Sequence, residues 1–315
     1  MRILTKASDK DFTVLNLTDI HWDIVAWAPG NQEYEMVVGT IREVVRRTQP
    51  DLITISGDLS WGMAVESYVA VAGLMDSFGI PWAPVWGNHD HEKEEVTRGA
   101  VAEFAKHPLC LFEDGDPALG SGNYCLLIQE NGRAVAALLM ADSHAGATYI
   151  DEAGVEQRGW AHLYPNQLDW IKEQCKELNT DTLLIQHIPI FGYAEVSQAA
   201  YRSDVDLQAL TVEESLSSAC WNPGYEESIG IQHEGIGSYP RDEGALEACV
   251  DAGLNAMIVG HDHNNNWIIR HKGIRFVYSL KTGPACYWKP YLNGGTVIKI
   301  TSQGLGQIYH EYVSF

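Results

Sequence analysis

The chain has 315 residues, of which 45% are hydrophobic and 20% are charged, so it can bury a core and disorder is excluded as its main state. Asp and Glu number 42 against 21 Lys and Arg, which gives a formal net charge of −21 at pH 7. Because such a surface repels phosphate backbones, we expect neither a nucleic-acid polymer nor an anionic membrane as a partner.

Strands and helices alternate along the chain. Apolar and β-branched runs predict strands at residues 12–18, 51–56, 82–86 and 134–140. Apolar side chains at helical spacing predict helices at 32–48 and 64–78. A helix at 165–178, a strand at 182–186, a helix at 243–252 and a strand at 255–259 follow. Beyond residue 267 the signals are β-rich, and Asn293-Gly294 is a candidate hairpin turn.

This alternation predicts an α/β fold with a largely parallel core sheet, and the late strands indicate a second sheet packed on the first. No Pro-, Gly- or Ser-rich linker divides the sequence, so residues 1–315 are expected to form a single domain. Residues 193–242 are rich in Ser, Gly and Glu and have weak periodicity. We expect this segment to be a long insertion or a lid.

Five of the predicted strands run into polar clusters. Ligands of open α/β sheets bind outside the carboxyl ends of strands, so these clusters are expected to meet at one edge of the sheet. The candidate metal ligands are Asp19, His21, Asp58, Asn88, His187, His261 and His263. Gly57, Gly87 and Gly260 directly precede three of these clusters, where tight backbone turns are expected.

Seven nitrogen and oxygen donors are too many for one tetrahedral zinc ion, but they suit two metal ions if one carboxylate bridges them. Imidazole and carboxylate donors without a thiolate favour Mn or Fe, with Zn as an alternative. The alternative to a metal site is a purely structural role, in which the polar residues at the strand ends cap helices and bind water. Asp19 and Asp58 could each do that, whereas four histidines and an asparagine in such order favour the two-metal interpretation.

The order of these clusters resembles that of the calcineurin-like metallophosphoesterases. The family motifs D-x-H, GD, GNH-D/E, H and GH-x-H correspond to residues 19–21, 57–58, 87–90, 187 and 260–263. Residues 57–60, 121–124 and 260–264 resemble the purple-acid-phosphatase-related branch. The resemblance implies a metallophosphoesterase fold, a four-layer αββα sandwich of two mixed β-sheets flanked by helices.

The resemblance also implies a role for each residue. One metal would be held by Asp19, His21, Asp58 and His263, and the other by Asp58, Asn88, His187 and His261, with Asp58 bridging. His89 matches the family's catalytic histidine, which binds no metal and faces the phosphate. Trp61 stands where purple acid phosphatases place an iron-binding tyrosine, so a purple iron–tyrosinate centre is not expected.

These features predict a hydrolase, a dinuclear metal-dependent phosphoesterase acting on a small phosphate ester. The two metals would lower the pKa of a bridging water, and the resulting hydroxide would attack phosphorus while His89 stabilises or protonates the leaving oxygen. The branch resemblance favours a phosphomonoester. A phosphodiesterase for a nucleotide or a small phosphodiester is the alternative. The candidate substrate contacts are Asn88, His89, His144 and Tyr124.

Two other classes of protein compete with this interpretation. A non-catalytic scaffold on the same fold is disfavoured because all seven ligand positions and His89 are present. An amidohydrolase-type enzyme would show an H-x-H motif on its first strand, whereas the first cluster here is Asp19-Ile20-His21.

The sequence also carries an expectation about location. No run approaches about 18 consecutive apolar residues, and the first twelve residues lack a signal-peptide core, so we expect a cytoplasmic protein without a membrane span. The six cysteines are widely spaced and are expected to be free, buried thiols. The oligomeric state stays open.

Overall fold

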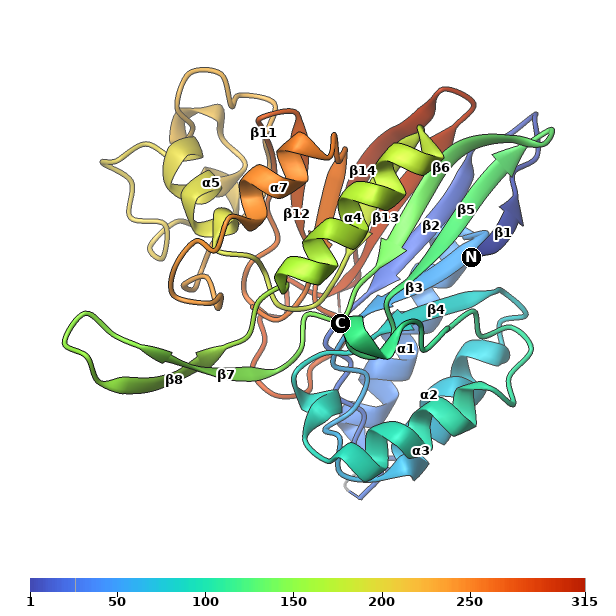
Figure 1. Ribbon diagram of the computed structural model, residues 1–315. Helices are drawn as coiled ribbons and strands as arrows, with labels where there is room; N and C mark the ends of the chain where they lie inside the picture. The colour runs from blue at the N-terminus through green and yellow to red at the C-terminus, as the bar shows by residue number, and fades with distance from the viewer. Residues whose placement is uncertain (26, 315) are drawn as a thin grey trace.

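The computed structural model describes residues 1–25 and 27–314. Two mixed β-sheets pack against each other, and helices cover the outer face of each sheet (Figure 1). The fold is therefore an α/β sandwich of four layers, αββα, which is the architecture that the family resemblance implied.

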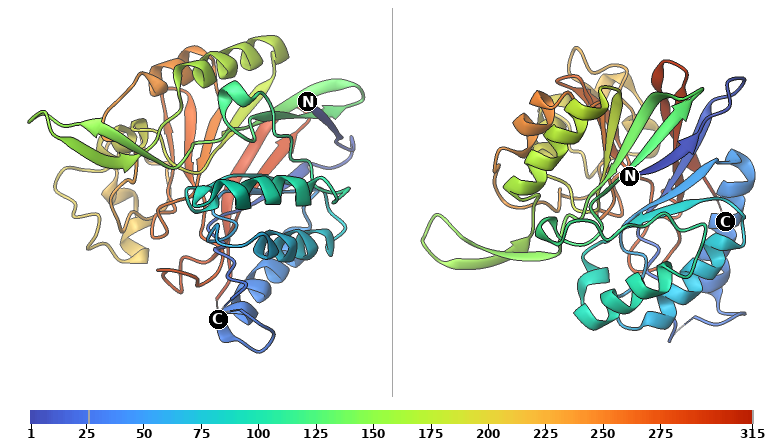
Figure 2. Two further views of the ribbon diagram at one scale, coloured as in Figure 1. Left: turned by 60° about the horizontal axis from the view of Figure 1, so that its bottom comes forward. Right: turned by 45° about the vertical axis from the view of Figure 1, so that its right-hand side comes forward.

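The smaller sheet has five strands in the order β14-β13-β2-β3-β4. Strands β2, β3 and β4 are parallel, whereas β13 is antiparallel to both of its neighbours. The strands are β2 (Phe12–Leu17), β3 (Leu52–Ser56), β4 (Trp82–Val85), β13 (Gly294–Thr301) and β14 (Gly304–Tyr312). The helices on the outer side of this sheet are α1 (Gln32–Thr48), α2 (Val65–Asp76) and α3 (Glu94–Phe104) (Figure 2).

The larger sheet has seven strands in the order β1-β5-β6-β9-β10-β12-β11. The strands are β1 (Arg2–Thr5), β5 (Tyr124–Glu130), β6 (Arg133–Met140), β9 (Asp181–Ile185), β10 (Ala256–Val259), β12 (Ile274–Tyr278) and β11 (Ile268–His271). Its helices are α4 (Pro165–Leu178), α5 (Gly192–Ala200) and α7 (Ala245–Asp251). Among the helices of residues 1–25 and 27–314, none is both long and apolar enough to cross a membrane.

Three layers of apolar side chains hold the sandwich together. One lies between the sheets and includes Val14 and Ile258. The second lies under α1, α2 and α3, and the third lies under α4, α5 and α7. Strand β2 is buried along its whole length because both of its faces are covered. This burial fixes the strand ends from which the polar clusters project.

Helix α1 shows how local sequence fixes an element. The Asn31 side chain caps its first turn by accepting a hydrogen bond from the backbone N–H of Tyr34. Acidic side chains in the first turn and Arg46 and Arg47 in the last turn complement the helix dipole. The buried face, which includes Ile41, packs on the five-stranded sheet. The predicted and observed ends of this helix coincide.

Two expectations about the sheets are wrong. The ligand-bearing strands do not share one largely parallel sheet, because β2, β3 and β4 lie in one sheet and β9 and β10 in the other. Asn293-Gly294 is not a hairpin turn, because Gly294 begins β13 and the hairpin to β14 turns at 302–303. The buried Asn293 side chain instead accepts from the Gly283 N–H and donates to the Val313 carbonyl.

Two segments stand apart from the layers. A hairpin of β7 (Gly146–Ile150) and β8 (Glu156–Trp160), which the sequence analysis did not predict, extends away from the sandwich (Figures 1 and 2). Residues 193–242 contain most of α5 and the short α6 (Val212–Ser215), and much of the rest is irregular. That the segment is a lid stays a prediction.

Candidate metal centre

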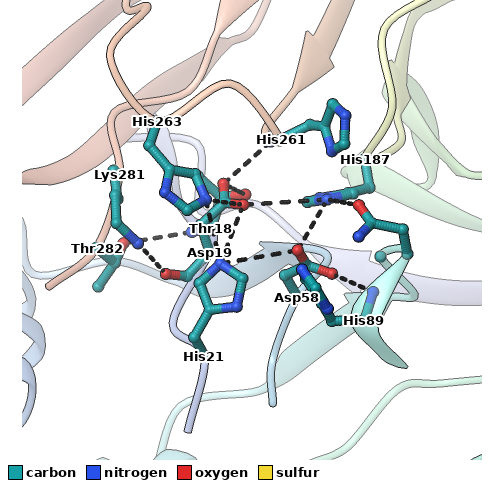
Figure 3. Close-up of polar contacts among 12 residues, drawn as sticks. Thr18, Asp19, His21, Asp58, His89, His187, His261, His263, Lys281 and Thr282 are labelled. Atoms are coloured by element: carbon teal, nitrogen blue, oxygen red, sulfur yellow. Dashed lines mark hydrogen bonds and ion pairs between the residues drawn. The ribbon is translucent and has the colours of Figure 1, made fainter. Parts of the chain in front are cut away.

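The predicted metal ligands come together where the carboxyl ends of strands from both sheets meet (Figure 3). They follow five strands: Asp19 and His21 follow β2, Asp58 follows β3, Asn88 follows β4, His187 follows β9, and His261 and His263 follow β10. All seven side chains are buried. The two sheets therefore each contribute part of one buried centre.

One group of donors surrounds Asp19. Its Oδ1 atom lies 3.2 Å from Nε2 of His263 and 3.8 Å from Nε2 of His21. The two Nε2 atoms lie 3.1 Å apart. Two imidazole nitrogens and a carboxylate oxygen thus converge on one point, as the ligands of a single ion would.

A second group surrounds His187. Its Nε2 atom lies 3.3 Å from Oδ2 of Asp58 and 3.2 Å from Oδ1 of Asn88. The same Asp58 oxygen lies 3.7 Å from Nε2 of His21, a member of the first group. The His261 ring centroid is 5.2 Å from that of His187. The Asp58 carboxylate therefore lies between the two groups, which is the placement that a bridging ligand needs.

The chemistry of the Asp19 carboxylate fits a cation. Its Oδ1 atom is buried and has no hydrogen-bond partner among the residues that the structure describes. Leaving such an oxygen unpaired is costly, so an ion at this point would satisfy it. Nδ1 of His187 and Nδ1 of His263 each lie 2.8 Å from a backbone carbonyl, of Ser56 and Tyr287 respectively. Each ring thus donates from Nδ1 and presents Nε2 as the free ligand atom.

The histidine pKa values fit the same interpretation. Burial lowers the pKa of His261 to about 3, so this ring stays neutral, as a metal ligand must be. Burial also acts to lower the pKa of His187, but Asp58 and Asp19 outweigh it and raise the pKa to about 10. The two carboxylates thus favour a positive charge beside them, which a metal ion can supply in place of a proton.

Four of these residues have a left-handed backbone conformation. The φ angles are 55° for Asp19, 50° for His21, 50° for Asp58 and 78° for His261. Residues other than glycine rarely adopt such angles, and those that do gather at functional sites. These backbone conformations therefore occur in loops that carry the candidate ligands, whose side chains are buried.

The three glycines are needed for different reasons. Gly57 has a φ of +89°, so the expected tight turn is present there. No such φ occurs at Gly87 or Gly260, where the constraint is close approach. A Cβ on Gly87 would overlap the Asp58 carboxylate, and a Cβ on Gly260 would overlap Thr18 and reach within 2.7 Å of Oδ2 of Asp19. Close packing, and not a positive φ, is therefore what requires glycine at these two positions.

We expect Gly260→Ala to weaken metal binding and to destabilise the fold by about 1–3 kcal/mol, the usual effect of overpacking. The added methyl group would push Thr18 and Asp19 away from the centre. Chemical denaturation and metal analysis of the purified variant measure both effects. Gly73→Ala is the matched control, because that helical glycine has open space around its Cβ position. Equal behaviour of the two variants would contradict the prediction.

Several supporting residues connect the ligand loops. The buried Asp90 carboxylate accepts hydrogen bonds from the N–H groups of Ser60 and Gly87 and from the Tyr68 hydroxyl. It thereby ties the loop that bears Asp58 to the loop that bears Asn88. On the other side, Nζ of the buried Lys281 donates to the Asp19 carbonyl at 2.7 Å.

Tyr68 and Lys281 were missed by the sequence analysis. Neither residue belongs to one of the ligand motifs, and its neighbours in the chain give no sign of its partner. Lys281 follows β12, and only the tertiary structure shows that the end of this strand lies beside Asp19. The hydrogen bond to the Asp19 carbonyl then explains why the ammonium group is buried.

His89 lies at the open side of the centre. Its backbone N–H donates to Oδ1 of Asp58 at 2.9 Å, and its side chain is 30% exposed. Nδ1 of the ring is 3.1 Å from Oε1 of Glu92, and the ring lies edge-on to those of His21 and Trp61. The ring is close enough to face a bound substrate, and it also forms a candidate ligand triplet with His21 and Asp58.

Two predicted substrate contacts lie elsewhere. The prediction that Tyr124 contacts the substrate is wrong. Its side chain is buried in the core between the sheets, and its hydroxyl donates to the Pro84 carbonyl. His144 forms a hydrogen bond through Nε2 with Gln167, and its ring centroid lies 4.4 Å from that of Tyr164. Its role in substrate binding stays a prediction.

The metal pocket has a volume of about 150 Å³. Asp58, Asn88 and His89 form one side, and Trp160 and Tyr287 form part of the rim. Trp160, at the base of the β7–β8 hairpin, lies edge-on to His261, and Tyr287 stacks on His263. Cys286 also lines the pocket and is exposed, so the expectation that every cysteine is buried is wrong for this residue.

Dimetal phosphoesterases are the class of protein that this fold and donor cluster define. Residues 12–265 match the family of calcineurin-like phosphoesterases, and the chain belongs to that family.

Named relatives and a solved structure agree with this assignment. The chain is 27% identical over 279 residues to "Probable inactive purple acid phosphatase 28" of Arabidopsis thaliana, a match that covers 79% of this chain and 62% of the relative. It is 25% identical over 290 residues to "Phosphatase DCR2" of Saccharomyces cerevisiae, covering 85% and 46%. A dimetal phosphatase from Danio rerio shares the fold, with a TM-score of 0.57, 12% identity, and coverage of 98% of this chain and 100% of that one. The chain thus spans less than two thirds of the length of these two curated relatives.

Proposed function

We propose that this chain hydrolyses a small phosphomonoester with two bound metal ions. The observation that carries the proposal is the buried Oδ1 atom of Asp19, which accepts no hydrogen bond from any described residue and which three imidazole Nε2 atoms surround at 3.2–4.0 Å. The word "inactive" in the name of the plant relative describes that relative. In this chain all seven predicted ligands and His89 lie together.

The residues suggest how the reaction would proceed. Asp19, His21, Asp58 and His263 would hold one ion, and Asp58, Asn88, His187 and His261 the other. Bound ions of this kind act as Lewis acids and supply hydroxide at neutral pH. Donors of this type favour Mn or Fe, with Zn as the alternative.

His89 would act on the leaving oxygen. Its ring is anchored to Glu92 and its backbone to Asp58, so it is oriented without being fully buried. From that position it would give a proton to the departing alkoxide or stabilise its charge. The Asn88 amide, at the edge of the same pocket, would help to orient the phosphoryl oxygens.

The pocket size supports a substrate whose phosphoryl group alone enters the centre. A volume of about 150 Å³ accommodates a phosphoryl group but not the remainder of a large ester. The leaving group would then lie outside the metal pocket. A small phosphodiester also satisfies this constraint and is the alternative substrate. The strongly acidic balance disfavours long nucleic acid.

The test combines metal analysis with two chromogenic substrates. Protein purified without chelator should hold about two metal ions per chain, and stripping them should abolish hydrolysis. Refilling with Mn²⁺ should restore turnover of p-nitrophenyl phosphate in preference to bis-p-nitrophenyl phosphate. Preference for the diester would favour the phosphodiesterase. No metal and no hydrolysis after any refill would contradict the proposal and favour a scaffold.

A further inference from the structure

A second, larger cavity adjoins the metal pocket on the far side of His89. Its volume is about 460 Å³, and His89 lines both cavities. The loops that follow β2 and β3 supply most of its lining, Ser67 of α2 contributes, and His89 and Glu92 come from the segment after β4. These loops also carry the metal ligands His21 and Asp58, so any molecule in this cavity lies next to the reacting centre.

The walls of this cavity are unusually apolar for exposed surface. Ile24 is 38% exposed, Val25 is 89% exposed and Met63 is 55% exposed. All three line the same cavity, whereas isolated apolar side chains are normally scattered over a surface. Exposed apolar groups gathered around one concavity mark a binding site.

Trp61 lines this cavity beside the metal centre. Its ring centroid lies 4.4 Å from that of His21 and 4.7 Å from that of His89. An indole has no lone pair with which to bind a metal ion, so its position here is explained by packing and by the flat face that it offers. A ring or an alkyl chain beside His89 would contact that face.

The charge of the cavity restricts its occupant further. Asp23 and Glu92 line it, and no lysine or arginine does so among residues 1–25 and 27–314. A negative group there would be repelled by both carboxylates. The leaving group that fits is therefore apolar and carries no negative charge.

We propose that this cavity, formed by Ile24, Val25, Trp61 and Met63, is a subsite for the leaving group, and that the substrate is the phosphate monoester of an aromatic or aliphatic alcohol without negative charge. This inference rests on the proposed function. In the reaction, water oxygen bonds to phosphorus and the bond from phosphorus to the alcohol oxygen breaks. The alcohol oxygen takes a proton from His89, the proton that the water loses restores His89 through solvent, and the products are inorganic phosphate and the free alcohol.

A binding experiment tests the subsite without requiring turnover. Calorimetry with the Mn²⁺-loaded protein would compare 1-naphthylmethylphosphonate with methylphosphonate, neither of which can be hydrolysed at its P–C bond. Burying the naphthyl group should tighten binding at least about 10-fold. Met63→Glu should remove this advantage and leave the affinity for methylphosphonate within about 2-fold. Val69→Glu is the matched control, because Val69 is exposed on α2 but does not line the cavity.

A kinetic experiment gives the same comparison during turnover. Met63→Glu should lower kcat/KM for 2-naphthyl phosphate about 10-fold or more, with little change for glycerol 2-phosphate. Equal binding of the two phosphonates by the parent protein, or equal effects of Met63→Glu and Val69→Glu, would overturn the subsite. Selective phosphonate binding without any hydrolysis would support the subsite and contradict the proposed function instead.

Discussion

Asp58→Asn is expected to remove both metal ions together and to lower kcat/KM by more than about 100-fold. The Asp58 carboxylate lies between the two donor groups, at 3.3 Å from His187 and 3.7 Å from His21. Losing even an outer partner of a ligand costs about 10–100-fold in metal affinity, and this residue is assigned directly to both ions. Metal content by mass spectrometry and the rate with p-nitrophenyl phosphate measure the two effects.

The substitution is informative because it should preserve the fold. Asparagine has nearly the same shape, and its Oδ1 can still accept the hydrogen bond from the His89 N–H. Asp9→Asn is a suitable control, because that side chain is exposed in a turn away from the centre. Loss of one metal ion with retention of the other would contradict the bridging assignment. Retention of both would contradict the assignment of Asp58 as a ligand.

His89→Ala is expected to retain both metal ions and to lose about 10²–10⁴-fold in kcat, the usual contribution of a general acid. The ring is 30% exposed and faces the pocket, whereas the seven assigned ligands are buried. Because proton donation matters most for a poor leaving group, the loss should be larger for an alkyl phosphate than for p-nitrophenyl phosphate. Steady-state rates with both esters measure this difference.

A second variant separates the role of the ring from the role of its partner. Glu92→Gln keeps a hydrogen-bond acceptor beside Nδ1 of His89 and should change kcat only modestly. If His89→Ala loses a metal ion, His89 is a ligand, as its proximity to His21 and Asp58 allows. Unchanged turnover in His89→Ala would remove His89 from the mechanism.

Much of the fold could be predicted from the periodicity of side chains. Helices α1 and α4 begin and end where the pattern of apolar residues and the terminal signals placed them. The hairpin of β7 and β8 was not predicted, because β8 (sequence EQRGW) contains only one apolar residue and no residue of either strand is buried. Local patterns reveal elements that bury one face, and this hairpin buries little.

The positions of the candidate substrate contacts were harder to predict than those of the candidate metal ligands. Tyr124 begins β5, and only the packing of the two sheets decides that its side chain faces the buried core. In the same way, Trp61 could be identified as a residue unable to bind iron, but not as a wall of the second cavity. Ile24 and Met63 are far apart in the chain, and only the tertiary structure shows that they line the same cavity.

The sequence by itself determined the set of donors, because each polar cluster directly follows a recognisable strand and the order of the clusters is characteristic of the family. Only the tertiary structure decided that β2, β3 and β4 approach the centre from one sheet and β9 and β10 from the other. It also decided which oxygen of Asp19 is left unpaired and which glycines must lack a side chain. The physical reason is that periodicity records how each segment is buried, whereas the distances between donors depend on how two sheets pack, which no single segment encodes.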